Sequence, residues 1–147
     1  MLVDAIVAWL HFLGIFVLVG SLSGELMSFR REMTQAAQKT LRVLDLHYGA
    51  AAGIVLITGL LRVFWYGKGA AYYAANPFFW ALIALFAAIG LLSLPPTLYY
   101  MRWRRSTGPV TVAEFDYRRI RRMLWLEAAG LVLAPLTATL MARGAGL

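Results

Sequence analysis

Four long apolar runs divide the sequence, and they constrain the fold more than any other feature. A helix needs about 20 consecutive, mostly apolar residues to cross the hydrocarbon core of a bilayer. The runs predict spans over about residues 2–29, 41–66, 77–101 and 123–142. We therefore expect an all-α integral membrane protein, a single transmembrane domain over residues 1–147, with an up-down-up-down four-helix bundle.

The amino-acid composition supports a membrane environment. Charged residues make up 14% of the chain and hydrophobic residues 61%, whereas soluble domains carry about 25% charged residues. The net charge of +7 is placed almost entirely between the apolar runs, which predicts a lipid bilayer and not nucleic acid as the partner. The chain has no cysteine, which excludes disulfides, iron–sulfur ligation and covalent c-type haem.

The distribution of basic residues predicts the orientation. Eleven of the 14 Lys and Arg residues lie between spans 1 and 2 or between spans 3 and 4. Cytoplasmic loops carry the excess of Lys and Arg. We therefore expect a multi-pass protein of the bacterial inner membrane with both termini in the periplasm. The other side of the membrane receives only Arg62, Lys68 and Arg143.

Both histidines of the chain fall inside predicted spans, His11 in AIVAWLHFLGIFVLVG and His47 in RVLDLHYGAAAGIVLITGLL. Ionisable side chains in hydrocarbon are functional candidates, and a neutral imidazole is a common ligand of haem iron. We expect His11 as the stronger haem ligand and His47 as the weaker one, with Arg62 and Arg143 meeting haem propionates. The alternative for His11 is a core histidine that bonds a hydroxyl or backbone group of span 2 or 4.

Three polar residues have similar predicted depths near the inner interface: Glu25, His47 and Glu127. Each lies five residues from an arginine at the interface. If they face inward, they form a polar layer suited to proton transfer. The alternative is that the two carboxylates pair with the nearby arginines.

Glycine spacings predict where helices approach closely. Gly20-x3-Gly24 in span 1 and Gly49-x3-Gly53 in span 2 place small residues one turn apart, as at many contacts between membrane helices. Between spans 2 and 3, the segment GKGAAYYAAN is predicted as an external loop. It ends at Asn76, a residue type that caps helices, directly before Pro77.

The sequence resembles the four-span bacterial family of predicted membrane proteins DUF2214. The resemblance is carried by WLHFLGIFVLVGSLSGEL, GIVLITGLLRVFWYGKGAAYY and RRMLWLEAAGLVLAPLTATLMARG. More distantly, the layout is similar to the HemJ protoporphyrinogen oxidase family and to CopD-like membrane proteins. The HemJ resemblance implies haem binding by His11, which stands at the place of an early histidine in span 1. That family also uses a lysine in span 3, and span 3 here has none, which argues against protoporphyrinogen oxidation.

Three functions follow as hypotheses. The first is a membrane protein that binds b-type haem through His11 and acts in electron transfer or as an oxidoreductase, as a homodimer, with a quinone or another redox partner. The second is a non-catalytic accessory or assembly subunit. The third is a small proton-coupled transport module centred on Glu25, His47 and Glu127.

Overall fold

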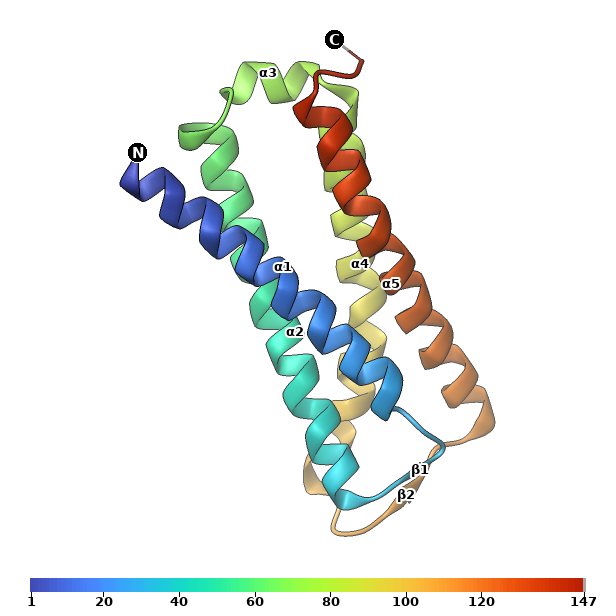
Figure 1. The fold of residues 1–147 in the computed structure, drawn as a ribbon. Helices are drawn as coiled ribbons and strands as arrows, with labels where there is room; N and C mark the ends of the chain where they lie inside the picture. The colour runs from blue at the N-terminus through green and yellow to red at the C-terminus, as the bar shows by residue number, and fades with distance from the viewer. Residues whose placement is uncertain (147) are drawn as a thin grey trace.

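The computed structural model describes residues 1–146, and these form an almost entirely helical membrane protein (Figure 1). The long helices are α1 (Leu2–Ser28), α2 (Gln35–Leu61), α4 (Pro77–Arg102) and α5 (Glu114–Ala142). The shorter elements are β1 (Glu32–Met33), a π-helical turn (Arg62–Tyr66), α3 (Ala70–Ala75), a 3-10 turn (Trp103–Arg105) and β2 (Val110–Thr111). The four long helices are apolar enough and long enough to cross a membrane, which confirms the predicted all-α membrane bundle.

The bundle consists of two helical hairpins, which we call the N-terminal arm (α1 and α2) and the C-terminal arm (α4 and α5). The helices pack most extensively within each arm. The arms approach each other at the end that carries β1 and β2, here the strand end, and diverge toward both chain termini, here the terminal end (Figure 1). Accordingly, α4 has no buried residue before Ile89, and α5 has none after Gly130. The shared core therefore lies in the strand half of the molecule.

The β1–β2 pair joins the two arms at the strand end. Glu32 pairs with Thr111 and Met33 with Val110 in antiparallel register. The buried Gln38 amide donates to the Met33 carbonyl at 3.1 Å and to the Gly108 carbonyl at 2.9 Å. These bonds satisfy backbone groups of both connecting segments, so the strand end is the better-fixed end of the bundle.

At the terminal end, the connection between α2 and α4 contacts the end of α5. The segment predicted as an external loop contains α3, and its side chains reach the end of α5. Lys68 Nζ donates to the Ala142 carbonyl at 2.8 Å, and the Tyr72 hydroxyl donates to the Met141 carbonyl at 3.2 Å. The predicted cap is present, because Asn76 Oδ1 accepts a hydrogen bond from the Phe78 backbone N–H at 2.9 Å. The last carbonyls of a helix have no intrahelical partners. Lys68 and Tyr72 donate hydrogen bonds to two of these carbonyls in α5.

One of the four glycines in the predicted pairs, Gly24, lies at a close helix contact. A Cβ atom at Gly20, Gly49 or Gly53 would have no neighbour within 4 Å. At Gly24 a Cβ would lie 3.0 Å from Leu44 Cδ1. Two glycines outside the predicted pairs are also tight: a Cβ at Gly14 would lie 2.9 Å from Val55 Cγ2, and one at Gly130 would lie 2.7 Å from Ile89 Cγ1. The predicted close approach is therefore confirmed at Gly24 and not at the other three glycines.

Candidate functional site

Two glutamates are fully buried where the arms meet. Glu25 on α1 is 2% exposed and Glu127 on α5 is 1% exposed. Glu25 follows buried Leu18 and Leu22 at helical spacing, and Glu127 follows Ile120 and Leu124 in the same way. Residues at i, i+3 or i+4, and i+7 share one helix face, so the apolar faces that build the core also carry these carboxyl groups inward.

Two tyrosines complete this site from the other two helices. Tyr48 on α2 is 4% exposed and Tyr100 on α4 is 0% exposed. The Tyr48 hydroxyl lies beside the Glu127 carboxyl group and the Tyr100 hydroxyl beside the Glu25 carboxyl group. All four helices therefore contribute to one layer of buried polar groups.

Neither carboxyl–tyrosine pair has the geometry of a formed hydrogen bond. Oε1 of each glutamate and the hydroxyl of each tyrosine are buried without a partner. Buried polar atoms are almost always bonded to protein, water or an ion. The layer thus has unused hydrogen-bonding capacity at four positions.

Asp45 and Thr97 extend the layer. The Thr97 hydroxyl on α4 donates to Asp45 Oδ1 on α2 at 2.6 Å, which ties the two arms together. Asp45 is close enough for its charge to act on both Glu25 and Glu127. We define the polar layer as six residues: Glu25, Asp45, Tyr48, Thr97, Tyr100 and Glu127.

The polar layer is acidic without a paired cation. Within residues 1–146, the ion pairs are Arg31 with Glu114 and Arg118 with Glu114, all exposed or half-exposed at the strand end. The sequence alternative that Glu25 and Glu127 pair with the interface arginines therefore does not describe the structure. Ionising both glutamates at once would leave two uncompensated charges in a buried site.

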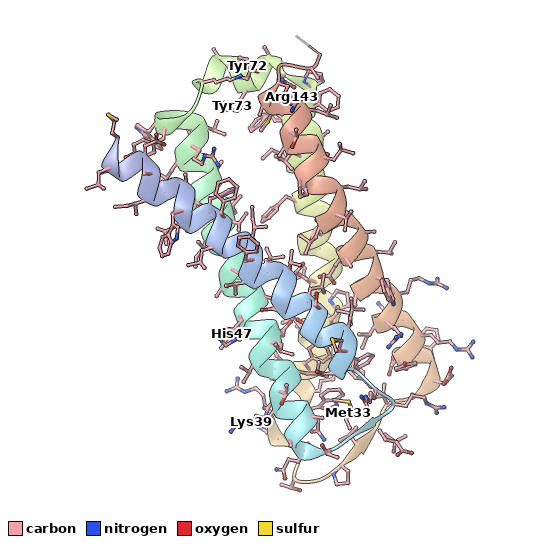
Figure 2. The ribbon with its side chains drawn as sticks, viewed as in Figure 1. Met33, Lys39, His47, Tyr72, Tyr73 and Arg143 are labelled. Atoms are coloured by element: carbon pink, nitrogen blue, oxygen red, sulfur yellow. The ribbon has the colours of Figure 1, made fainter. Side chains whose placement is uncertain are left out.

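His47 does not join the polar layer, which corrects the predicted convergence of Glu25, His47 and Glu127. Its side chain is exposed on the outward side of α2 (Figure 2), and its ring Nδ1 lies 2.6 Å from the Val43 carbonyl of its own helix. Tyr48, one residue later, faces inward instead. One residue is about 100° of helix rotation, so depth alone could not distinguish these two neighbours.

His11 is held between α1 and α2, in the N-terminal arm. Its Nδ1 lies 2.9 Å from Thr58 Oγ1, and the Thr58 hydroxyl donates to the Ile54 carbonyl at 2.6 Å. A hydroxyl has one proton to donate, so Thr58 accepts from an Nδ1–H, and His11 Nε2 keeps its lone pair. Gly59 leaves room for the ring, because a Cβ there would lie 3.4 Å from His11 Cε1.

The two arginines predicted for propionates lie on different arms. Arg62 follows α2, and its guanidinium lies 5.9 Å from the centroid of the Phe12 ring, next to His11 in sequence. Arg143 is exposed at the end of α5, close to α3 (Figure 2). The structure places Arg62 near His11, whereas Arg143 belongs to the other arm. Among the described residues, no three or more His, Asp or Glu side chains are grouped as metal ligands.

Sequence reasoning identified Glu25 and Glu127 but missed Asp45, Tyr48 and Tyr100. The signal was present in the spacing. Tyr48 lies seven residues after Leu41 and three before Ala51, both buried, and Tyr100 lies four residues after buried Pro96. A search for polar residues in phase with the small and branched apolar ones would have found both tyrosines.

The comparisons with known proteins give a family and no activity. The chain matches the family described as predicted membrane protein (DUF2214) over residues 3–146. No curated protein and no solved structure matches it.

Proposed function

The chain belongs to the DUF2214 family of predicted membrane proteins, and from the polar layer we propose that it is a proton-coupled transport module of the membrane. The observation that carries this proposal is the pair of fully buried carboxyl groups, Glu25 and Glu127, on opposite arms, with no ion pair to either among residues 1–146. Intramembrane carboxyl groups are costly, and they mark ion pathways and proton relays.

The chemistry of the layer suits reversible proton uptake. A protonated glutamate can donate to its neighbouring tyrosine, and an ionised one can accept from it. Tyr48 lies beside Glu127 and Tyr100 beside Glu25, so a small side-chain movement would give each carboxyl group a hydrogen-bond partner in either state. Protons bound here are therefore held within the bundle without requiring a fixed counter-ion.

Because the layer lies between the two arms, proton binding there would change how the arms pack against each other. Glu25 belongs to the N-terminal arm and Glu127 to the C-terminal arm, and their charges are close enough to interact. Ionisation of both would push the arms apart and admit water, whereas protonation would let them pack. Because β1 and β2 join the arms at the strand end, the ionised state would open the layer toward the terminal end and the protonated state would close it.

Proton flux into liposomes tests the proposal. Purified protein is reconstituted with a pH-sensitive dye inside, and an inward pH gradient is applied. We expect faster equilibration than in protein-free liposomes, and loss of that acceleration in the Glu25→Gln/Glu127→Gln double variant. Glu114→Gln is the matched control, because Glu114 is a half-exposed carboxylate outside the layer. Unchanged flux in the double variant would reject proton transfer through this layer.

Haem binding by His11 is the second candidate. The observation that favours it is the orientation of the ring, with Nδ1 bonded to Thr58 and Nε2 left free. An axial histidine whose other nitrogen is bonded is the usual arrangement at metal sites. Bound b-type haem would supply one-electron transfer, with a quinone or a protein as the redox partner. Arg62, on the same arm as His11, would bind an anionic group of the haem.

Absorption spectra distinguish this candidate from the first. Haem binding predicts a Soret band in the purified protein that is lost in His11→Ala and kept in His47→Ala. A second axial histidine would come from another copy of the chain, so the haem-loaded protein would be a dimer. A protein that is colourless after growth with ample haem would reject this candidate and leave the proton proposal untouched.

A further inference from the structure

A basic pocket of about 340 Å³ opens at the strand end, between the start of α2 and the turn that follows α4. Its lining includes no residue of the polar layer and does not include His11. Its lining combines polar, basic and aromatic side chains from the two arms. The lining residues are Gln35, Ala36, Gln38, Lys39, Arg42, Trp103, Arg104 and Ser106.

Three cationic side chains without acidic partners line the pocket. Lys39, Arg42 and Arg104 take part in neither of the ion pairs found among residues 1–146. The Nε of Arg42 is buried without a hydrogen-bond partner. An unpartnered guanidinium nitrogen at a pocket wall is a donor for an anion that is not part of the chain.

The start of α2 adds to the positive potential. Gln35 and Ala36 are the first residues of this helix, where backbone N–H groups lack intrahelical partners. The cap residue Thr34 accepts from Ala37 N–H at 3.2 Å and leaves the two earlier N–H groups free. A helix N-terminus favours anions, so backbone and side chains act on one site.

The walls of the pocket are fixed by the fold. The Gln38 amide is occupied by the Met33 and Gly108 carbonyls. Trp103 is 6% exposed, and its ring lies 5.7 Å from the Tyr100 ring, centroid to centroid. Gln38 and Trp103 therefore form the rigid wall, and the three cations form the binding groups.

We propose that this pocket binds the phosphate headgroup of an anionic glycerophospholipid. It lies at one end of four membrane-capable helices, where headgroups are found. Arginine binds phosphate oxygens through two parallel hydrogen bonds, and basic pockets between membrane helices recognise anionic headgroups. The proposal rests on the pocket alone and is independent of proton transfer and of haem.

Lipid counting by native mass spectrometry tests it. Detergent-purified protein is titrated with phosphatidylglycerol and, in parallel, with neutral phosphatidylcholine. We expect selective binding of phosphatidylglycerol, and about thirtyfold weaker binding in Arg42→Gln/Arg104→Gln, from about 1 kcal/mol per cation. The matched control is Arg119→Gln/Arg122→Gln, which removes the same charge from exposed positions on α5 outside the pocket.

Three results would overturn the proposal. One is equal binding of the two lipids to the unmodified protein. Another is an equal loss of phosphatidylglycerol binding in the control variant, which would indicate general charge attraction. The third is displacement of phosphatidylglycerol by inorganic phosphate at equal concentration, which would assign the pocket to a soluble anion. Circular dichroism shows whether each variant keeps its helices, so that a folding defect is not mistaken for lost binding.

Discussion

At the scale of single residues, Glu25 and Glu127 differ from the other acidic side chains. Asp4 and Glu32 are exposed, and Glu114 pairs with two arginines. Glu25 and Glu127 instead lie in the core with an unpartnered oxygen each. A buried charged group costs far more than a buried neutral one unless it is paired, so their protonation state is tied to how tightly the core is packed.

Infrared spectroscopy can observe these protons directly. We expect the lipid-reconstituted protein to show a C=O stretching band of protonated carboxyl groups in a dry environment, which decreases as the pH is raised. Part of this band should disappear in Glu25→Gln and part in Glu127→Gln, because each variant removes one buried carboxyl group. Glu114→Gln should leave the band unchanged. A pH-difference spectrum that is identical in all variants would contradict proton binding by the polar layer.

At the scale of helices, the α4–α5 contact depends on Gly130 having no side chain. A Cβ at Gly130 would lie 2.7 Å from Cγ1 and 2.9 Å from Cδ1 of Ile89, which is 4% exposed. Ile89 is β-branched and buried, so it has little freedom to move aside. Packing between membrane helices favours such small residues.

We therefore expect Gly130→Ala to lower the free energy of unfolding by about 1–3 kcal/mol, the usual cost of overpacking. Gly90→Ala is the control, because a Cβ at Gly90 has nothing within 4 Å and alanine is the better helix former. The measurement is unfolding in mixed micelles with increasing denaturing detergent, followed by circular dichroism. Equal stability of the two variants would show that the arm repacks around the added methyl group.

The helices could be predicted from the sequence, but their rotations could not. The apolar runs located all four long helices, and Asn76 before Pro77 located the start of α4. The apolar run predicts a fourth span from about Met123, and α5 itself begins at Glu114, because a basic segment extends the helix before the apolar run. A membrane helix is apolar on most sides, so the apolar pattern of α2 does not indicate whether His47 or Tyr48 faces inward.

Contacts between segments far apart in the chain could not be predicted from the sequence either. β1 and β2 are two residues each and lie in different connections, so neither has a recognisable strand pattern. Asp45 and Thr97 likewise lie 52 positions apart. The membership of the candidate site depends on such contacts, which explains why two of its carboxyl groups were predicted and its tyrosines were not.

At the scale of the whole molecule, the strand end carries most of the positive charge. Both termini lie at the opposite end (Figure 1). Since cytoplasmic loops carry the excess of Lys and Arg, we expect the strand end in the cytoplasm. Alkaline phosphatase fused to the C-terminus should be active, and green fluorescent protein fused there should be dark. Fusions ending at Gly108 should give the reverse. The opposite pattern would invert the orientation.

The divergent arms allow a last prediction about the molecule as a whole. They are joined at the strand end by β1 and β2, so separation of the arms at the polar layer should be amplified at the terminal end. The chain has no cysteine, which allows spin labels to be attached at Val3→Cys on α1 and Arg143→Cys after α5, both exposed positions. Pulsed electron paramagnetic resonance then measures the distance between the arms.

We expect a longer and broader distance distribution at alkaline pH than at acid pH, because ionised Glu25 and Glu127 repel each other across the arms. Adding Glu25→Gln/Glu127→Gln to the labelled protein should give the acid distribution at both pH values, since the glutamine side chains cannot ionise. Adding Glu114→Gln should keep the pH dependence. If the distribution is the same at both pH values without the glutamine substitutions, protonation of the layer does not move the arms, and proton transfer would have to occur within a rigid bundle.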